Sequence, residues 1–247
     1  MSKQVKISKG IDIKLKGVAD KILGTMAFPD TIAIKPTDFE GLNPKMMVKV
    51  GAEVKAGTPL FYDKNHDKVK ITSTVSGEVA EIRRGAKRKI LEVVILADKE
   101  IRYENFTPLA ADAMTRENVT KTLLDSGAWA FIRQRPYNVV ADPEMMPKSI
   151  FISAFDTAPL APDYDYILHG ESKDFQAGID ALSTLTSGKI HLNIDGKTKA
   201  DDVFLNAENV QINKVSGPHP AGDIGPQIHF IDPITKGDTV WHVNPQD

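Results

Sequence analysis

Two half-motifs decide the fold of the first part of the chain: VKVGAEVKAGTPLFYD at residues 48–63 and ITSTVSGEVAEI at residues 71–82. Each alternates short runs of β-forming residues with glycine at the expected turns, which are Gly51 and Gly57 in the first and Gly77 in the second. Glycine readily adopts the positive φ angles that tight turns between strands need. The pattern therefore predicts a β domain of short strands and tight turns over residues 1–100.

These half-motifs resemble the barrel-sandwich hybrid of biotinyl and lipoyl carrier domains. A carrier presents a modifiable lysine on the hairpin between its two halves, and the equivalent position in this sequence is His66. Lys64 and Lys68 lie close by, but neither has the flanking residues of a carrier lysine in register. We therefore expect an unmodified domain with no modified lysine, in which His66 is a polar loop residue.

The composition excludes several classes of protein. With 247 residues, 41% of them hydrophobic, the chain can form one large or two modest domains and is too apolar to be disordered. No run approaches the ~20 apolar residues that span a bilayer, and the N-terminus lacks the apolar run of a secretory signal. Without cysteine, the chain cannot form a disulfide, an iron–sulfur cluster or a cysteine-ligated zinc site. A cytoplasmic protein is the default expectation.

Charge is unevenly distributed along the chain. Residues 1–100 contain 19 Lys+Arg and 13 Asp+Glu, whereas the remaining residues contain 12 and 20. This asymmetry favours two domains, with an acidic or anionic partner for the first, and the dispersed basic residues do not favour nucleic acid. One local cluster, RRGAKRK at residues 83–89, lies between two apolar strand patterns and predicts a hairpin tip. This tip either is simply solvated or contacts a neighbouring protein of a complex or an anionic lipid surface.

Residues 101–247 predict a Rossmann-like α/β domain. Thr115 is placed to cap a helix that ends at Gly127. Beyond it, strand patterns around residues 150–152, 190–194 and 210–215 alternate with helical patterns. This β-α-β-α-β order is typical of a parallel sheet with right-handed crossovers. The overall fold class is thus α/β plus β, with a hybrid barrel followed by a Rossmann-like domain.

A dinucleotide site would need a glycine-rich loop between the first of these strands and the next helix. The segment after Phe151 is SAFDTAPLAPDYDYILHG, which supplies proline and aspartate where a pyrophosphate needs glycine. A nucleotide site is therefore not favoured, and no cofactor-binding residue is predicted.

Two longer motifs add a resemblance to a known family. SGPHPAGDIGPQIHFIDPI at residues 216–234 and KISKGIDIKLKG at residues 6–17, with the order of the two domains, are similar to the A subunit of the bacterial Na+-translocating NADH:quinone reductase. The family is related more distantly to the NADH- and flavin-binding subunit of complex I and to the C subunit of the Rnf complex. Because family members are longer, we expect an N-terminal fragment that lacks later β-grasp-like and helical portions.

The resemblance implies a cofactor-free peripheral subunit on the cytoplasmic side of the inner membrane. The complex would pass electrons from NADH to ubiquinone and export Na+. Its flavins and iron–sulfur would be held by other subunits, one of which is a membrane subunit. The isolated chain would not be catalytic, and roles in quinone binding and assembly are implied for it. The alternative is a free-standing flavin- or NAD-dependent oxidoreductase.

The candidate contact residues come from two segments. In the flavin-binding relative, a helix ending in Ser-Gly runs into a glycine-rich loop around the flavin, whereas here AWAFIRQRP follows at residues 128–136. Its bulky residues either plug the old cofactor space or contact a quinone head group or a neighbouring subunit. His219 lies on the second segment, the proline-rich turn GPHPAG. The predicted quinone or partner contacts are Trp129, Phe131, Arg133, Arg135 and His219.

No metal site is predicted from spacing. His219, His229 and His242 are far from one another in the sequence, and with Asp223 and Asp232 they match no metal-binding motif. Spacing alone also supports no Ser-His-Asp triad and no pair of catalytic carboxylates, so no catalytic residue is predicted.

Overall fold

The computed structural model describes residues 2–247, which form two compact units. We call them the hybrid unit, which comprises Gly24–Arg133 and Tyr137–Pro143, and the α/β unit, which comprises the residues up to Leu23, Gln134–Pro136 and Glu144–Asp247. Within residues 2–247, no helix has both the length and the apolar composition that a membrane crossing requires.

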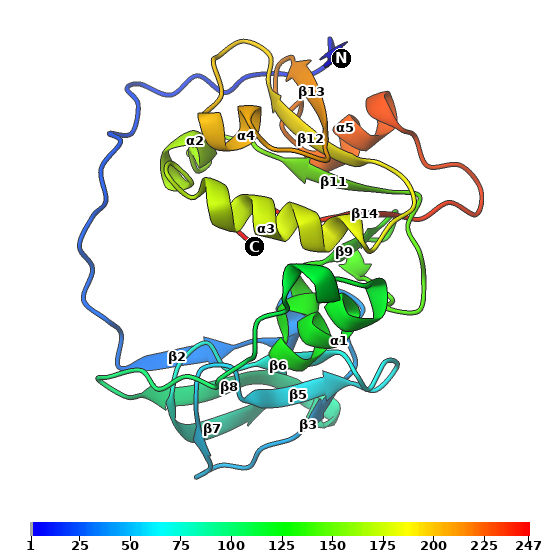
Figure 1. Ribbon diagram of the computed structural model, residues 1–247. Helices are drawn as coiled ribbons and strands as arrows, with labels where there is room; N and C mark the ends of the chain where they lie inside the picture. Colours follow the sequence, from blue (N-terminus) through cyan, green and yellow to red (C-terminus); the bar gives the residue numbers. More distant parts are fainter. Residues whose placement is uncertain (1) are drawn as a thin grey trace. The chain divides into compact units, whose positions relative to one another are not determined.

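The hybrid unit consists of two small antiparallel sheets (Figure 1). Their shared core contains Leu60, Phe61 and Val79, each fully buried. The four-stranded sheet has the order β2 (Thr31–Ile34), β8 (Ile90–Ala97), β7 (Gly77–Arg84) and β4 (Glu53–Val54). The three-stranded sheet has the order β3 (Pro44–Met46), β5 (Pro59–Asp63) and β6 (Lys70–Thr72). The predicted short strands are confirmed.

Strands β7 and β8 form the predicted hairpin. At its base, a Cβ on Gly77 would overlap the carbonyl oxygen of Leu96, so only glycine fits there. At its tip, the 3-10 helix η2 (Ala86–Arg88) carries the basic cluster on exposed residues. The glycines of the half-motifs therefore mark close approaches of the backbone as well as turns.

The predicted helix that follows the hybrid sheets is α1 (Arg116–Ser126). The side chain of Thr115 accepts a hydrogen bond from the backbone N–H of Asn118, and Gly127 ends the helix in a left-handed conformation. Three short 3-10 helices complete the unit: η1 (Pro36–Asp38), η3 (Ala111–Ala113) and η4 (Ala128–Phe131). Both predicted ends of the helix are confirmed, because capping is a local signal.

The α/β unit is built on parallel strands, as predicted. Their order in the sheet is β1 (Lys3–Lys6), β13 (Gln211–Ser216), β12 (Ile190–Asp195), β11 (Ser149–Ser153) and β14 (Val240–His242). Its helices are α2 (Tyr164–Ile167), α3 (Ser172–Ser183), α4 (Asp202–Leu205) and α5 (Ile224–Ile231). Two further short strands, β9 (Arg133–Arg135) and β10 (Val139–Val140), lie where the chain passes from one unit to the other.

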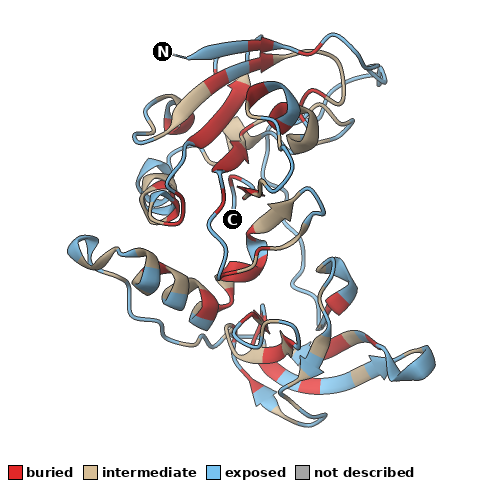
Figure 2. Cartoon of the chain, turned by 90° about the vertical axis from the view of Figure 1, so that its right-hand side faces the viewer, coloured by how far each residue is buried: buried red, intermediate tan, exposed pale blue. Residues whose placement is uncertain are grey.

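Helices α3 and α5 cover opposite faces of this sheet. Ile152 lines a pocket with Ile179 of α3, whereas Phe151 belongs to a buried cluster with Ile228 of α5. Successive residues of a strand point to opposite faces, so the two helices lie on different sides. Strands β11 and β12 are accordingly buried along almost their whole length (Figure 2).

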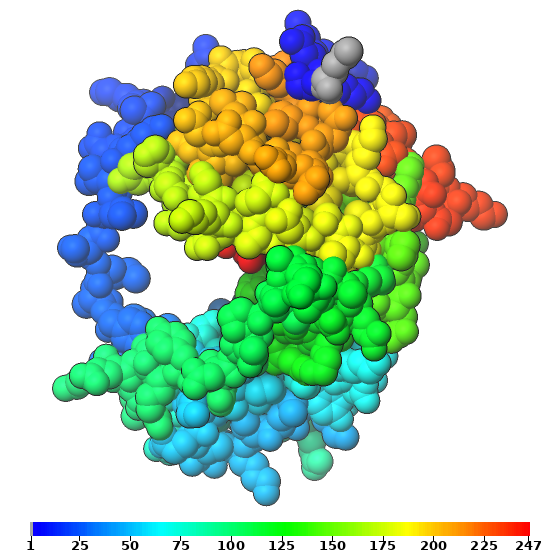
Figure 3. Space-filling view, in the orientation of Figure 1, coloured from blue at the N-terminus to red at the C-terminus, as the bar shows by residue number. Residues whose placement is uncertain are grey.

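The two units do not correspond to a single division of the chain at residue 100, because the first strand belongs to the α/β unit. Residues 3–6 form β1, which pairs in parallel with β13, so the N-terminus belongs to the α/β unit. Burial of Val5 and Ile7 in the cluster with Val215 supplies the physical reason. Residues 8–30, all of them described, then form neither helix nor strand, and their side chains are exposed (Figure 3, blue).

A buried histidine makes the stability of the α/β unit depend on pH. His191 in β12 stacks on Phe151, with 4.5 Å between ring centroids, and its Nδ1 lies 3.2 Å from Nδ2 of Asn213. Burial lowers the pKa of His191 from its ordinary 6.5 to about 4. In the unfolded chain the imidazole takes up a proton at higher pH than in the fold, so acid favours unfolding.

We expect the free energy of unfolding to fall by about 3 kcal/mol as the pH drops from about 6.5 to about 4, because His191 must stay neutral in the fold. The variant His191→Phe keeps the ring stacking and removes the titration, so its unfolding free energy should fall less over this range. Denaturant unfolding at a series of pH values measures this difference. The exposed-histidine variant His229→Phe is the control and should keep the wild-type slope; identical slopes for all three proteins would contradict the assignment.

Candidate functional site

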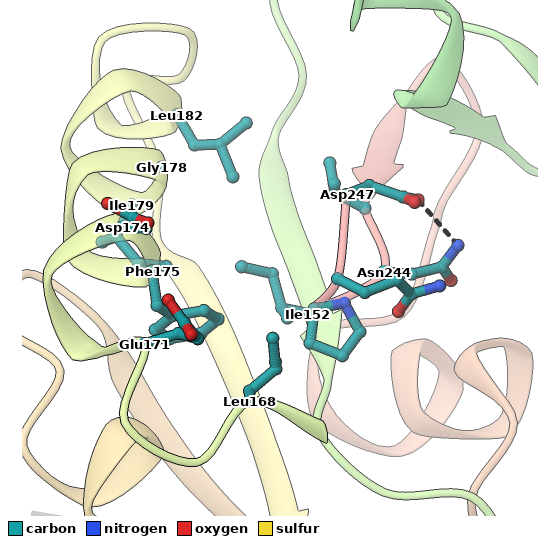
Figure 4. A pocket seen from close by; sticks show the side chains of 13 residues that line it. Ile152, Leu168, Glu171, Asp174, Phe175, Gly178, Ile179, Leu182, Asn244 and Asp247 are labelled. Atoms are coloured by element: carbon teal, nitrogen blue, oxygen red, sulfur yellow. Dashed lines mark hydrogen bonds between the residues drawn. The ribbon is translucent and has the colours of Figure 1, made fainter. Parts of the chain in front are cut away.

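The α/β sheet has a crevice where dinucleotide-binding proteins place their ligand. Strands β12 and β14 lie on opposite sides of β11, so the order of connection reverses there. In open α/β sheets, ligands bind outside the carboxyl ends of the strands at such a reversal. A pocket of about 300 Å³ lies at this point, lined by Ile152, by α3 and by residues 243–247 after β14 (Figure 4).

The lining of this pocket is unsuited to a phosphate. Its charged groups are the carboxylates of Glu171, Asp174 and Asp247, and among the described residues that line it none is lysine or arginine. Asp247 also accepts a hydrogen bond of 2.9 Å from the side chain of Asn244 (Figure 4). Because the loop after β11 carries no glycine either, the crevice has the shape of a Rossmann site without its anion-binding chemistry.

The AWAFIRQRP segment begins inside the hybrid unit. Trp129 is completely buried, and its Nε1 donates a hydrogen bond of 2.8 Å to the carbonyl oxygen of Ala141. Phe131, two residues further on, is 48% exposed. In this conformation Trp129 fills the interior, as expected for a plug, while Phe131 reaches the surface.

The two arginines of the segment belong to different units. Arg133 lies in the hybrid unit, where its Nη2 donates to the carbonyl oxygen of Asp38 and its guanidinium carbon lies 5.8 Å from the ring centroid of Phe39. Arg135 lies in the α/β unit and packs against Gly225 of α5. If Gly225 carried a Cβ, that atom would lie only 2.9 Å from Nη2 of Arg135. The five predicted contact residues are thus divided: Trp129, Phe131 and Arg133 belong to the hybrid unit, and Arg135 and His219 to the α/β unit.

His219 lies on a closely packed turn that joins β13 to α5. Its Nδ1 lies 3.1 Å from Oγ1 of Thr157, and this hydroxyl oxygen also accepts a hydrogen bond of 2.9 Å from the backbone N–H of Gly222. The backbone N–H of His219 donates to Oδ1 of Asp12. A Cβ on Gly222 would overlap the backbone nitrogen of Thr157, so the turn and the loop after β11 are in direct contact.

A buried glutamine fastens this turn to the sheet. Gln227 of α5 is fully buried, and its Nε2 donates to the carbonyl oxygens of Ala221 and Gly222 and to Oγ of Ser153. Its Oε1 accepts a hydrogen bond of 2.7 Å from Asn193 of β12. One side chain therefore connects α5, strands β11 and β12 and the turn.

The sequence pointed to His219 but not to the residues that hold its ring and its turn in place. Thr157 and Gln227 lie apart from His219 in the sequence, and only the fold brings them together around its turn. One signal was present: Gln227 is the only residue of IGPQIHFI, besides a histidine, with a hydrogen-bonding side chain. A lone amide on a buried helix face usually has partners.

The fold and the site together define a class of protein: a barrel-sandwich hybrid linked to a Rossmann-like α/β unit that lacks a phosphate cradle. Two family models match the chain. The one described as "NqrA N-terminal barrel-sandwich hybrid domain" matches residues 5–98, and the one described as "NqrA second alpha/beta domain" matches residues 114–247. The chain belongs to the NqrA family, which confirms the predicted resemblance.

Curated relatives agree with this assignment. They are named as the A subunits of Na(+)-translocating NADH-quinone reductases, and those from Neisseria meningitidis, Photorhabdus laumondii and Yersinia pestis are 37%, 36% and 36% identical to this chain. Each match covers 98% of this chain and 54% of the relative. The chain therefore spans about half the length of the curated relatives it matches.

Replacing Gln227 by leucine should destabilise the α/β unit. The change leaves the buried Asn193 amide and two buried carbonyl oxygens without this partner, and we expect a loss of about 3 kcal/mol in the free energy of unfolding. Denaturant unfolding followed by the fluorescence of the buried Trp241 measures it. Gln4→Leu, at an exposed position of β1, is the control and should change stability by less than about 0.5 kcal/mol. An equally small effect at Gln227 would contradict its proposed role.

Proposed function

We propose that the chain is a peripheral subunit of a Na+-translocating NADH:quinone reductase, the complex that transfers electrons from NADH to ubiquinone and exports Na+. The observation that carries this proposal is the match of 36–37% identity over 98% of the chain to relatives that bear this name. The isolated chain is not catalytic in this proposal. It acts through the other subunits with which it assembles.

In this proposal the chain binds neither flavin nor NADH. Two observations support this part: the acidic lining of the crevice at the strand reversal, and the glycine-free loop after β11. A third is Trp129, which occupies the interior where the flavin-binding relative has a glycine-rich loop. The flavins and iron–sulfur of the complex then belong to its other subunits, in keeping with a chain that has no cysteine.

The proposed location is the cytoplasmic side of the inner membrane, in contact with a membrane subunit. The basic tip of the β7–β8 hairpin, at residues 83–89, supports such docking because its residues are mostly exposed and carry five positive charges. Arg83 is in part neutralised, since its guanidinium lies 2.8 Å from a carboxylate oxygen of Glu81. The remaining cations can face an acidic partner or anionic lipid headgroups.

We further propose that Phe131, Arg133, Arg135 and His219 contribute to quinone or subunit contacts, with Trp129 supporting Phe131 from the interior. Quinone recognition needs an apolar surface and a donor for the carbonyl oxygens. Phe131 offers the first because almost half of its side chain is exposed. Arginine side chains offer the second.

Purified protein should be colourless. Because the proposal assigns flavins to other subunits, the absorbance spectrum should lack a flavin band at about 450 nm, also after incubation with excess flavin and gel filtration. A stoichiometric band would contradict it and favour the alternative, a free-standing flavin-dependent oxidoreductase.

The variant Phe131→Ala in the assembled complex should weaken binding of a quinone-site inhibitor by about tenfold, because an aromatic anchor is lost. Inhibitor titrations of the NADH:quinone reductase activity measure this. Phe230→Ala is a matched control, because both phenylalanines are 48% exposed and Phe230 lies on α5 of the other unit. Unchanged titrations for Phe131→Ala would contradict a role of this residue in inhibitor binding.

A further inference from the structure

Three potential metal ligands converge at the turn before α5. Asp156, His219 and Asp223 each offer one ligand atom, and these atoms all lie within 4.8 Å of one another. Asp156 follows β11, whereas His219 and Asp223 follow β13, so the group lies where the carboxyl ends of parallel strands meet. Spacing in the sequence could not show this, because Asp156 is 63 residues from His219.

Each of the two carboxylates keeps a ligand atom available. Asp156 accepts the N–H of Ala158 through Oδ1 alone, which leaves Oδ2 outside this bond. Asp223 occupies the N-cap of α5 yet makes no side-chain capping bond to the described residues of that helix. The helix therefore does not use the Asp223 carboxylate.

The imidazole of His219 has the arrangement of a metal-binding histidine. Its Nδ1 lies 3.1 Å from Oγ1 of Thr157, which can accept the Nδ1 proton while Nε2 coordinates an ion. Metal-bound histidines usually hold their second ring nitrogen in such a bond, which fixes the ring. Thr157 is itself held by the backbone N–H of Gly222, so its position does not depend on a ligand.

The backbone around the cluster is held independently of the three ligands. Gln227 binds the carbonyl oxygens of Ala221 and Gly222, and Gly222 packs against the backbone of Asp156 and Thr157. The carboxylates of Asp156 and Asp223 are exposed and can rotate. The ligand atoms of a tetrahedral Zn²⁺ site lie ~3.3 Å apart, so the atoms here, at most 4.8 Å apart, need to approach one another by no more than about 1.5 Å.

The donor set selects a class of ion. Two carboxylates balance the charge of a divalent cation, and the imidazole nitrogen favours a transition metal over Mg²⁺ or Ca²⁺, which prefer oxygen ligands. Three protein ligands leave a fourth position for water, as in open zinc sites. We propose that Asp156, His219 and Asp223 bind one Zn²⁺ ion, which fastens the turn before α5 to the loop after β11. This proposal does not rest on the proposed function, although His219 also belongs to the residues proposed above for quinone or subunit contacts.

The site is tested by isothermal titration calorimetry, in which ZnCl₂ is titrated into the 247-residue chain after treatment with a chelator. We expect one Zn²⁺ bound per chain and a higher melting temperature with Zn²⁺ present. His219→Ala and Asp223→Asn should each weaken binding by at least about tenfold. Asp223→Asn keeps the shape of the side chain and removes no capping bond, so it should fold even if His219→Ala does not.

A second histidine–carboxylate pair supplies the matched control. His169 is exposed, and its Nδ1 lies 2.7 Å from Oδ2 of Asp201, whose hydrogen bond raises the pKa of His169. The variant His169→Ala should leave the titration unchanged. The proposal is overturned if Zn²⁺ does not bind, if Asp223→Asn binds like the wild type, if His169→Ala removes the binding, or if MgCl₂ binds equally well.

Discussion

The side-chain amide of Gln227 makes hydrogen bonds to four groups: Ser153 at the end of β11, Asn193 of β12, and the carbonyl oxygens of Ala221 and Gly222. All of these bonds lie in or next to the core, where an unpaired polar group is costly. The turn before α5 therefore cannot move away from the sheet without breaking several of them. The positions of His219 and Asp223 depend on this constraint.

The same edge of the sheet combines a Rossmann-like crevice with a loop that is unsuited to a phosphate. The strand order produces a crevice, but aspartate and proline occupy the loop where glycine would cradle a phosphate. In the hybrid unit, the resemblance to carrier domains puts His66 at the position of the carrier lysine, and Trp129 is buried in the interior. With the absence of cysteine, these features are the observations behind our proposal that other subunits hold the electron carriers.

Local signals in the sequence were sufficient for much of the fold. Thr115 and Gly127 bracket α1 because capping depends on neighbouring residues, and alternation along 190–194 indicated β12. Contacts between distant segments could not be predicted from the sequence. The pairing of β1 with β13 and the approach of Asp156 to His219 depend on the closed fold, so no spacing rule indicated them. The burial of Trp129 was one of two open alternatives, since an aromatic residue suits both a core and a binding surface.

Native-state hydrogen exchange tests the central claim, a turn that is preformed and held by buried hydrogen bonds. The backbone N–H groups of Ala221, Gly222 and Asp223 donate to Pro218, Thr157 and Pro220, respectively. We predict that these three amides exchange as slowly as those of β11 and β12, through opening of the whole α/β unit. Exchange at the rate of an unstructured loop, while β11 and β12 remain protected, would contradict this claim.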